Sequence, residues 1–350
     1  MSEFDELGGW PSVLGRLLGA GSLGERDAEL VIGQVLDGSA TAAQTAALLV
    51  ALRAKGETVE EMTGLVRAML ARAEPLMLPC PAIDVVGTGG DRLRSINVST
   101  IAACIAAGAG VAVCKHGNRA ASSSVGTADV LEALGVAVDL GPAGVARCVA
   151  EAGMGFCYAP RFHPALRHLG PIRRELGIPT VFNFLGPLAN PARVDRQLVG
   201  VSDPAMATKM ASVLGANGSR RAMVVYADDG LDELSVTSPS TVVEMVGDGQ
   251  GSFEVRSWRM DPVALGFAPA TMEDLRGGDA AFNAKVIRSV LEGERGPRRD
   301  IGLLNAAAAL VVAGRVDDLG AGIELATESV ERGRAAAVLD RLVEVSQAAR

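Results

Sequence analysis

The hydrophobic pattern changes character about one fifth of the way along the chain. Before that point, apolar residues recur every three or four positions in 28–38, 41–56 and 58–73, which is the spacing of amphipathic helices. Glycine, serine and threonine separate these segments, as is typical of helix ends and N-caps. The pattern therefore predicts only helices from Pro11 to about Ala73.

From residue 82 onward, short apolar runs alternate with helical segments. The strand candidates lie at 82–86, 111–115, 136–140, 154–159, 197–201 and 221–227. The helical segments between them lie at 98–108, 126–135, 142–153 and 203–218. Alternation of this kind predicts a mainly parallel central sheet flanked by helices. Two further strand candidates, 241–246 and 252–258, precede long helices that begin at about Ala280.

One interval interrupts the alternation. Residues 163–190 have no clear strand pattern and look helical, so we expect them to fold back onto the N-terminal helices. The predicted fold class is α/β, with a small all-helical N-terminal domain and a large α/β domain. The small domain would span 1–76, with helices from about 163–190 packed on it, and the large domain 77–162 and 191–350.

Composition narrows the class of partner. The formal net charge is -8, and the basic residues are scattered, so the chain lacks the electrostatic footprint of a nucleic-acid-binding protein. Five cysteines without CxxC spacing indicate free thiols in a reducing compartment. The uncharged stretch 96–114 is long enough to raise the question of a membrane span, but its polar start and its glycines favour a buried helix followed by a strand. With no signal-peptide pattern at the N-terminus, we expect a cytoplasmic protein without a membrane or nucleic-acid partner.

A glycine-rich turn follows the first strand candidate. Residues 87–90 read Gly-Thr-Gly-Gly, and hydroxyl and amide side chains follow at the start of the next helix, at Ser95, Asn97, Ser99 and Thr100. Glycines let backbone N–H groups approach a ligand, and a helix start adds free N–H groups and partial positive charge. The stretch is neither a Walker A loop nor GxGxxG. It predicts a phosphate site; a tight turn with an N-cap is the alternative.

Two more polar stretches follow later strand candidates. Residues 115–129, KHGNRAASSSVGTAD, follow the second strand, and loops after neighbouring parallel strands meet in one crevice. Two such loops predict a ligand with more than one phosphate. The alternative for residues 115–129 is a solvated polar loop that binds no ligand. Asp232 and Glu233 follow the strand candidate 221–227. Adjacent carboxylates repel unless they are solvated or bridged by a cation, and Mg²⁺ prefers carboxylates, water and substrate phosphates.

These stretches, in this order, carry a resemblance to a known family. GTGGD, NVST, KHGNRAASS, ADVLEALGV, RRELGIPTVFNFLGPLANP and LDELS resemble the anthranilate phosphoribosyltransferase family over nearly the whole chain. The resemblance implies transfer of 5-phosphoribose from phosphoribosyl pyrophosphate (PRPP) to anthranilate, the second step of tryptophan biosynthesis from chorismate. It also implies Mg²⁺, two ions per subunit, and a homodimer formed through the helical domain.

The resemblance implies roles for the matched residues. It places PRPP on Gly87, Thr88, Gly89, Gly90, Asp91, Ser95, Asn97, Val98, Ser99, Thr100, Lys115, His116, Gly117, Asn118, Arg119, Ala120, Ala121, Ser122, Ser123 and Thr127. It places anthranilate on Gly87, Asn118 and Arg173, with His116 and His163 near its path. It places Mg²⁺ on Ser99, Asp232 and Glu233. The chain departs from the usual family pattern at Arg92, Arg94, Ser95 and Thr127.

The chemistry of this reaction requires no covalent nucleophile or strong base, because the attacking aromatic amine is neutral at pH 7. That agrees with a sequence in which no Ser-His-Asp or Cys-His arrangement is evident. Two alternatives remain open on the sequence. A pyrimidine nucleoside phosphorylase-like enzyme would need no magnesium pair, and a catalytically inactive nucleic-acid-binding relative would need a basic groove, which the sequence pI of about 5.1 opposes.

Overall fold

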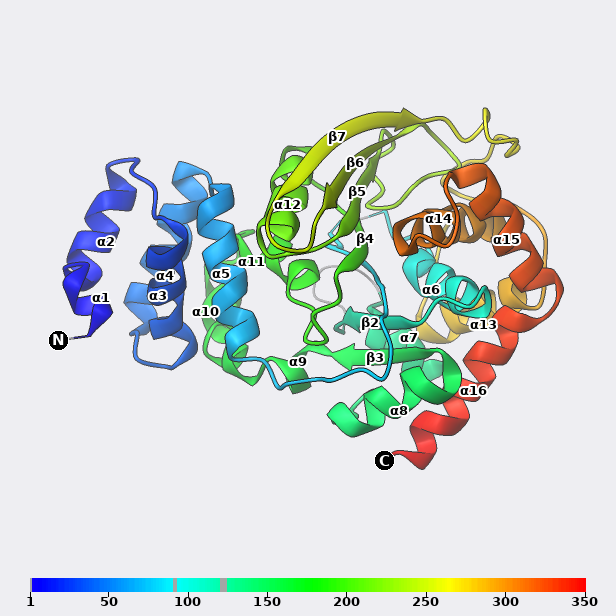
Figure 1. The fold of residues 1–350 in the computed structure, drawn as a ribbon, viewed down its shortest axis with the longest axis horizontal. Coiled ribbons are helices and arrows are strands. Elements are labelled where there is room, and N and C mark those ends of the chain that lie inside the picture. Colours follow the sequence, from blue (N-terminus) through cyan, green and yellow to red (C-terminus); the bar gives the residue numbers. More distant parts are fainter. Residues whose placement is uncertain (1, 91–92, 120–124) are drawn as a thin grey trace.

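The computed structural model describes residues 2–90, 93–119 and 125–350, with the N-terminal helices at one end of the molecule (Figure 1). These helices are α1 (Glu3–Glu6), α2 (Gly9–Leu18), α3 (Glu25–Leu36), α4 (Ala42–Lys55) and α5 (Val59–Ala71). Capping boxes at Thr41 and Thr58 begin α4 and α5, and they satisfy backbone N–H groups that a helix start leaves free. The prediction of helices over 28–73 is confirmed.

A mixed sheet forms the centre of the larger part. Within the described residues, five strands pair in the order β1 (Asp84–Gly87), β4 (Arg196–Gly200), β5 (Arg221–Ala227), β6 (Ser240–Gly247) and β7 (Phe253–Met260). The first three are parallel and the last two antiparallel. β2 (Val113–Gly117) pairs in parallel with β3 (Met154–Tyr158), and a bridge between Ile83 and Val113 brings this pair alongside β1. The predicted α/β class is confirmed.

The strand prediction at 136–140 is wrong. The segment is buried but forms no ladder, and its residues lie against the C-terminal helix α16 (Arg334–Ala348). The backbone N–H of Ala137 donates to Ser346 Oγ at 3.0 Å, and Gln347 Nε2 donates to the carbonyl of Gly135 at 2.8 Å. A short apolar run has the same appearance whether it is buried against a strand or a helix, which explains the error.

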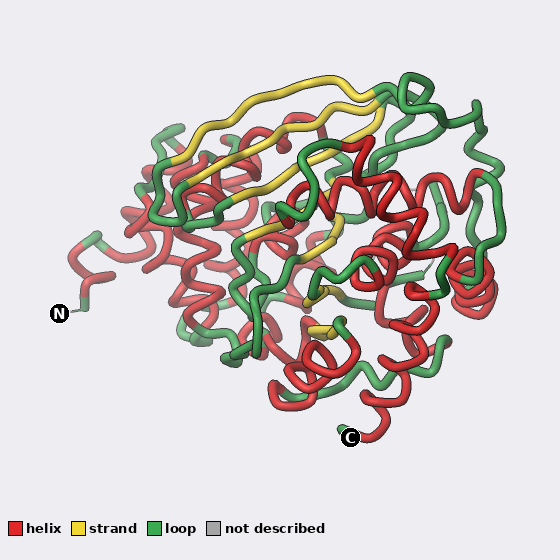
Figure 2. Tube along the Cα trace, turned by 45° about the vertical axis from the view of Figure 1, so that its right-hand side comes forward, coloured by secondary structure: helices red, strands yellow, loops and turns green. Residues whose placement is uncertain are grey.

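Helices cover both sides of the sheet (Figure 2). The helix α12 (Pro204–Ala216) packs on β5 and β6, and α14 (Pro297–Ala313) packs on β4 and β5. Around α14 lie α6 (Val98–Gly108), α13 (Ala280–Leu291) and α15 (Leu319–Glu331), and α16 packs on α6 and α8 (Pro142–Ala152). α7 (Thr127–Ala133) lies beside α13, and α8 lies beside β3. Within the described residues, none of the helices combines the length and apolar character needed to cross a membrane.

The interval that interrupts the alternation is helical. It contains η1 (Pro164–His168), α10 (Gly170–Leu176), α11 (Phe182–Leu185) and η2 (Gly186–Leu188), and α9 (Ala159–Phe162) leads into it from β3. α10 contacts α4, η1 contacts α3, and α11 contacts α5. These contacts bring the interval against the N-terminal helices and, through η2, against β2. A cavity forms between these layers.

Candidate active site

A cavity of about 350 Å³ lies where the carboxyl ends of β1 and β2 meet the start of α6 and the interval 159–187. Eighteen of the residues singled out from the sequence line it: Gly87, Thr88, Gly89, Arg94, Ser95, Asn97, Val98, Ser99, Lys115, His116, Gly117, Asn118, Arg119, Thr127, His163, Arg173, Asp232 and Glu233. Segments up to 146 residues apart therefore share one wall, as loops at the same edge of a parallel sheet should.

The remaining predicted residues fall into two groups. Gly90 and Thr100 are described but do not line the cavity. Thr100 is fully buried in the first turn of α6, and its backbone N–H donates to the carbonyl of Asn97 at 3.1 Å. The residues that lie outside the described part of the chain are Asp91, Arg92, Ala120, Ala121, Ser122 and Ser123.

In the glycine-rich turn at 87–90, hydrogen bonds to neighbouring residues hold a backbone conformation that residues other than glycine rarely adopt. Gly89 and Gly90 have φ of 64° and 86°, a region that glycine enters without steric cost. The N–H of Gly89 donates to Asp232 Oδ2 at 2.7 Å, and the N–H of Thr88 donates to the carbonyl of Gly200 at 2.9 Å. The turn therefore follows β1 and touches the carboxylate loop directly.

The start of α6 is left open toward the cavity. Asn97 occupies the N-cap position, yet its side chain makes no capping bond. Instead, Asn97 Oδ1 accepts a hydrogen bond from Nδ2 of the buried Asn283 at 3.0 Å. Two N–H groups of this first turn are used locally, since that of Val98 donates to the carbonyl of Ile96 at 2.8 Å and that of Thr100 to the carbonyl of Asn97 at 3.1 Å. A helix start nevertheless carries partial positive charge, so this end of α6 suits a phosphate.

Lys115 lines the cavity and lies within the electrostatic influence of the buried carboxylate of Asp84. Its side chain is 1% exposed, and Nζ donates to Ser99 Oγ at 3.1 Å and to the carbonyl of Val85. Burial lowers the pKa of Lys115, and the charge of Asp84 opposes that shift. Burial also raises the pKa of Asp84 to about 6, with Lys115 opposing the rise. A buried charge is costly unless it is paired, so Asp84 and Lys115 support each other.

Asp232 and Glu233 come together with the phosphate loop. Each is 8% exposed, and both lie on the loop that follows β5. A Cβ at Gly200 would stand 1.6 Å from the carbonyl oxygen of Asp232, and one at Gly87 would stand 2.7 Å from Asp232 Oδ2. Glycine at these two positions is what permits the carboxylate loop to approach β1 and β4 so closely.

This donor set fits a magnesium ion. The carboxylates of Asp232 and Glu233 and the hydroxyl of Ser99 are oxygen donors that line the same cavity. Mg²⁺ takes few oxygen ligands from a protein and keeps water and phosphate oxygens. In the described part of the chain, no group of three or more His, Cys, Asp or Glu is placed to hold a metal. Water and substrate oxygens would therefore complete the coordination.

Arg173, on α10, presents a cation to the other side of the cavity. Its Nη2 donates to Asn183 Oδ1 at 3.2 Å, and its guanidinium lies 5.9 Å from the centre of the Phe182 ring. Within the described residues it forms no ion pair with a carboxylate, and burial lowers its pKa. A guanidinium in this position suits a carboxylate ligand, because its planar donors match both oxygens.

The rings of His116 and His163 lie in contact at the cavity, with centroids 5.2 Å apart and planes tilted by 53°. His116 Nδ1 lies 3.1 Å from the carbonyl of Gly186; because a carbonyl only accepts, Nδ1 carries the proton and Nε2 the lone pair. That Nε2 is buried and accepts no hydrogen bond from the part of the chain that the structure describes. Burial, with His163 as a second cause, lowers the pKa of His116 to about 3. His163 Nε2 lies 2.8 Å from the carbonyl of Ala189.

Arg119 is engaged by acidic side chains in this structure. Its guanidinium pairs with Glu132 at 2.6 Å and with Asp129 at 3.1 Å, and it lies over the ring of Tyr158. These partners raise its pKa further. To contact a phosphate, the Arg119 side chain would have to break its ion pairs with Glu132 and Asp129. The structure therefore does not hold Arg119 in position for its expected PRPP contact.

Sequence reasoning missed several residues of the site. Asp84 lies inside a strand candidate, and its charge within an apolar run was the one feature of the sequence that could have marked it as a site residue. Phe182 and Asn183 belong to the interval 163–190, whose packing the pattern did not resolve, and Met69 and Leu166 add apolar wall. None of them stands in a loop that follows a strand, which was the feature used for prediction.

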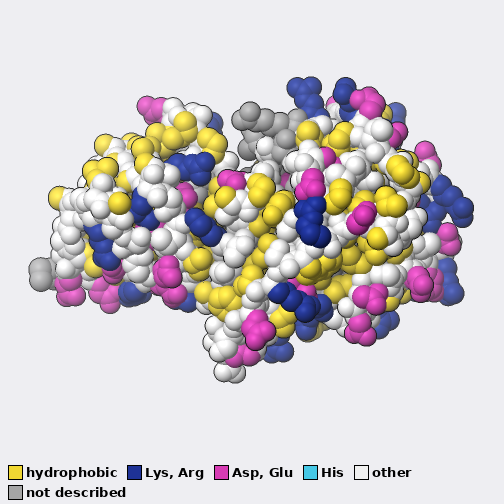
Figure 3. Space-filling view, turned by 90° about the horizontal axis from the view of Figure 1, so that it is seen from above, with side chains coloured by type: hydrophobic (Ala, Val, Ile, Leu, Met, Phe, Trp, Pro, Cys, Tyr) yellow, Lys and Arg dark blue, Asp and Glu magenta, His cyan; other side chains and the backbone are white. Residues whose placement is uncertain are grey.

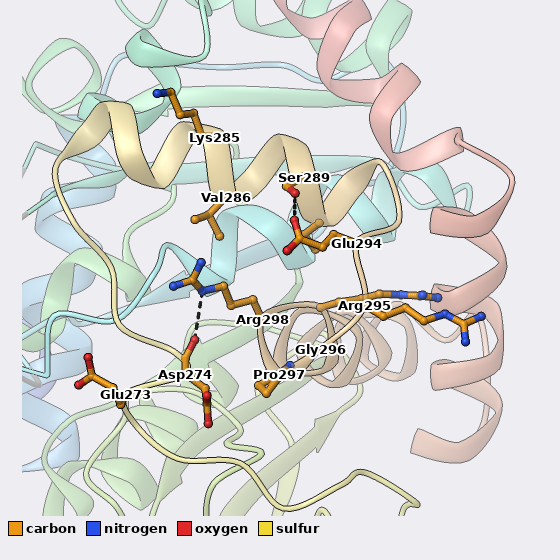
Figure 4. A pocket seen from close by; sticks show the side chains of 12 residues that line it. Glu273, Asp274, Lys285, Val286, Ser289, Glu294, Arg295, Gly296, Pro297 and Arg298 are labelled. Atoms are coloured by element: carbon orange, nitrogen blue, oxygen red, sulfur yellow. Dashed lines mark hydrogen bonds between the residues drawn. The ribbon is translucent and has the colours of Figure 1, made fainter.

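A second, more open cavity of about 500 Å³ lies between α13 and the start of α14 (Figure 4). Its lining carries both signs of charge, and the residues drawn there bond to one another. Arg298 Nε donates to the carbonyl of Asp274 at 3.1 Å, and Ser289 donates to Glu294. The residues singled out from the sequence lie in the first cavity, which is therefore the candidate active site.

Comparison with known proteins gives one consistent family. Residues 11–73 match the model described as "Glycosyl transferase family, helical bundle domain", and residues 80–336 match "Glycosyl transferase family, a/b domain". Similar curated proteins are the anthranilate phosphoribosyltransferases of Salinispora arenicola, 51% identical over 97% of this chain and 98% of that protein, and of Acidothermus cellulolyticus, 54% identical over 97% and 96%.

Solved structures agree. The anthranilate phosphoribosyltransferase of Thermus thermophilus superposes with a TM-score of 0.89 at 41% identity, covering 95% of this chain and 99% of that one. The enzyme of Saccharomyces cerevisiae in complex with PRPP and Mg superposes with a TM-score of 0.85 at 28% identity, covering 99% of each chain.

Proposed function

This chain belongs to the anthranilate phosphoribosyltransferase family of glycosyl transferases, and from that membership we propose how its cavity transfers 5-phosphoribose from PRPP to anthranilate. The reaction gives N-(5-phosphoribosyl)anthranilate and pyrophosphate, the second step of L-tryptophan biosynthesis from chorismate. The observation that carries the proposal is a single cavity that brings together an open helix start, a buried lysine, a carboxylate pair and an arginine without an acidic partner among the described residues.

One side of the cavity suits PRPP. As the bond between ribose C1 and the pyrophosphate oxygen breaks, its electron pair leaves with pyrophosphate, and positive charge develops on the sugar. Lys115 and the partial positive charge at the start of α6 stabilise the negative charge that develops, and they do so from a buried, fixed position. Gly87 and Gly89 let the backbone approach the substrate. Nearly all the predicted PRPP residues in the described part of the chain line the cavity.

The opposite side suits anthranilate. Arg173 binds the carboxylate through two parallel donors, and Asn183 and Phe182 hold the guanidinium in place. His116 is neutral at pH 7, because its pKa is near 3, and its Nε2 lone pair has no hydrogen-bond partner among the described residues. We assign this nitrogen to accept a hydrogen bond from the anthranilate amine, which orients the amine nitrogen toward C1. Orientation of two substrates supplies a large part of such a rate enhancement.

The metal would sit between the two carboxylates and the substrate. Ser99, Asp232 and Glu233 would hold Mg²⁺, two ions per subunit, and bound Mg²⁺ supplies positive charge against the pyrophosphate oxygens. The yeast relative crystallised with PRPP and Mg supports this use of the metal. The carboxylate pair favours this reaction over that of a pyrimidine nucleoside phosphorylase, and the net charge of -8 disfavours a nucleic-acid-binding role.

We propose three further properties. The small domain spans 1–76 with the interval 163–190 packed on it, a division supported by contacts of α10, η1 and α11 with α4, α3 and α5. The protein is a homodimer formed through that domain. It acts in the cytoplasm, where the free cysteines Cys80, Cys104, Cys114, Cys148 and Cys157 remain reduced.

The experiment that tests the function follows the loss of anthranilate fluorescence after PRPP and Mg²⁺ are added. Initial rates are titrated with Mg²⁺ for the wild type, Asp232→Asn and Glu233→Gln. Removing one electrostatic stabiliser from a preorganised site typically costs ~10²-fold in turnover. We expect that loss together with a higher Mg²⁺ requirement in both variants. Superimposable titrations of all three proteins would remove the carboxylates from the metal site.

A further inference from the structure

Asn305 is a fully buried amide in the middle of α14, on the far side of the carboxylate loop from the cavity. Its neighbours along the helix, Leu303, Leu304 and the alanines 306–309, are apolar and buried. A polar side chain in such a position costs free energy unless its hydrogen bonds are made. The partners of this amide therefore show what it contributes.

Both backbone groups of Leu234 bond to this one side chain. The N–H of Leu234 donates to Asn305 Oδ1 at 3.0 Å, and Asn305 Nδ2 donates to the carbonyl of Leu234 at 2.8 Å. Nδ2 also donates to the carbonyl of Ile301, one turn earlier in α14, at 2.9 Å. Because both N–H bonds and the oxygen are used, the orientation of the amide is fixed. Asn305 thus pairs with Leu234 as a neighbouring strand would.

Leu234 directly follows Asp232 and Glu233, so this bond fixes the carboxylate pair from one side. From the other side, the backbone of Asp232 lies against Gly200, and its carboxylate accepts from the N–H of Gly89. The three residues 232–234 are thereby held at both ends. The direction of the Cα–Cβ bond of Glu233 follows from this backbone, because residue 233 lies between the two attachment points.

We propose that Asn305 is a positioning residue for the magnesium-binding carboxylates. It does not touch the cavity, and it acts through the backbone of Leu234. This inference rests on the proposed function, in which Asp232 and Glu233 hold Mg²⁺. Residues behind the direct ligands typically affect metal affinity ten- to a hundredfold, and Asn305 is the described side chain that bonds both backbone groups next to the pair.

The decisive variant is Asn305→Asp, because two physical effects then oppose each other. The substitution keeps the shape of the side chain and an acceptor for the Leu234 N–H, but it removes both Nδ2 donors. Added negative charge by itself would strengthen cation binding, whereas loss of the Leu234 carbonyl bond releases the loop. We expect roughly tenfold to hundredfold weaker binding of Mn²⁺. Asn305→Leu removes all three bonds without adding charge, and we expect a loss of the same size or larger.

The measurement is a titration with Mn²⁺ alone, in which the paramagnetic resonance signal reports the free ion. Each protein is studied well below its own melting midpoint. Ser346→Ala is the matched control, since Ser346 is also fully buried and bonds to a backbone N–H, that of Ala137, away from the cavity. We expect Ser346→Ala to bind Mn²⁺ like the wild type. In parallel, the anthranilate KM of both Asn305 variants should stay near the wild-type value.

Two results would overturn the inference: wild-type Mn²⁺ affinity in the folded Asn305→Leu variant, which adds no charge, or equal losses in the Asn305 variants and in Ser346→Ala. Failure of the proposed function gives a different result. If Asp232→Asn binds Mn²⁺ as tightly as the wild type, the metal is not held by the carboxylate pair at all. If Asp232→Asn binds Mn²⁺ more weakly than the wild type but the Asn305 variants bind it as tightly as the wild type does, the carboxylates hold the metal and only the positioning role of Asn305 is rejected.

Discussion

Arg173 and Arg174 are neighbours in α10, yet their surroundings differ. Arg173 lines the cavity and contacts Asn183 and Phe182, whereas Arg174 is exposed and does not line it. The spacing of a helix explains the difference, because adjacent residues point about 100° apart. A matched pair of cations on one short helix is therefore available for testing the anthranilate contact.

Arg173→Ala should raise the anthranilate KM and leave the PRPP KM nearly unchanged. A hydrogen bond to a charged group contributes about 1.5–3 kcal/mol, which corresponds to roughly ten- to a hundredfold. Steady-state rates over a range of each substrate measure both constants. Arg174→Ala is the control and should resemble the wild type. An unchanged anthranilate KM in Arg173→Ala would exclude this residue from the site.

His116 gives the protein a pH-dependent stability. Its pKa is about 3 in the folded protein against an ordinary value of 6.5, so below pH 6.5 the unfolded chain binds a proton that the folded protein does not. The stabilisation is complete above pH 6.5 and is lost as the pH falls toward 3, by up to about 1.4 kcal/mol per pH unit.

Melting curves between about pH 7 and pH 5 test this effect, because histidine titrates there when unfolded. The variant His116→Asn keeps a donor for the carbonyl of Gly186 but has no titrating ring. Its melting temperature should fall less steeply with decreasing pH than that of the wild type. Equal slopes for the two proteins would show that His116 is not held neutral by the fold.

At the scale of elements, the close approach of the loop carrying Asp232 and Glu233 to strand β4 decides where the site forms. β4 passes under the carboxylate loop at Gly200, and any side chain there meets the Asp232 carbonyl. Sequence pattern predicted β4 itself, but a glycine in a strand does not reveal what approaches it. In contrast, Gly15 in α2 has open space around its Cα, which no sequence pattern distinguishes from the crowding at Gly200.

Gly200→Ala should lower both stability and magnesium affinity. Overpacking typically costs 1–3 kcal/mol, as an order of magnitude, and the displaced atom belongs to a proposed metal ligand. Thermal melting and the Mg²⁺ titration of initial rate measure the two effects. Gly15→Ala is the contrasting substitution and should stabilise the protein by about 0.5–1 kcal/mol, since alanine favours a helix interior. A Gly200→Ala protein with normal Mg²⁺ dependence would contradict the close-approach argument.

The order of elements explains how much of the site could be predicted. Loops that follow parallel strands meet at one sheet edge, so the sequence alone brought Gly87, Lys115 and Asp232 together. Asn305 and Asn283 escaped prediction because they lie within helices, 71 and 186 residues from their partners. A buried asparagine in an apolar helix looks unfavourable until the backbone group that it bonds is known. The failed strand at 136–140 has the same cause, since its partner is α16.

At the scale of the whole molecule, exposed apolar side chains on the surface indicate an interface. Hydrophobic side chains are visible on the end formed by the N-terminal helices, at the left in Figure 3. Leu18 on α2 is 78% exposed, Val50 on α4 is 40% exposed, and Ile178 just after α10 is 46% exposed. α2 and α10 both contact α4, so these side chains belong to one group of helices. Single exposed apolar residues are ordinary, but a group on packed helices marks an interface more often.

The homodimer prediction can be tested on this surface with one substitution and its control. Val50→Glu places a charge on α4, where burial in an interface would be unfavourable, and it should shift the protein toward monomer in light scattering at micromolar concentration. Val263→Glu alters a comparably exposed valine, 60% exposed, in the loop after β7, and it should leave the wild-type mass unchanged. Activity is measured on the same samples.

A wild type that is monomeric and fully active would reject pairing through the helical domain, and loss of the dimer in Val263→Glu alone would place the interface elsewhere. A Val50→Glu monomer with full turnover would instead show that each cavity works without its partner, as expected if the residues lining it come from one chain.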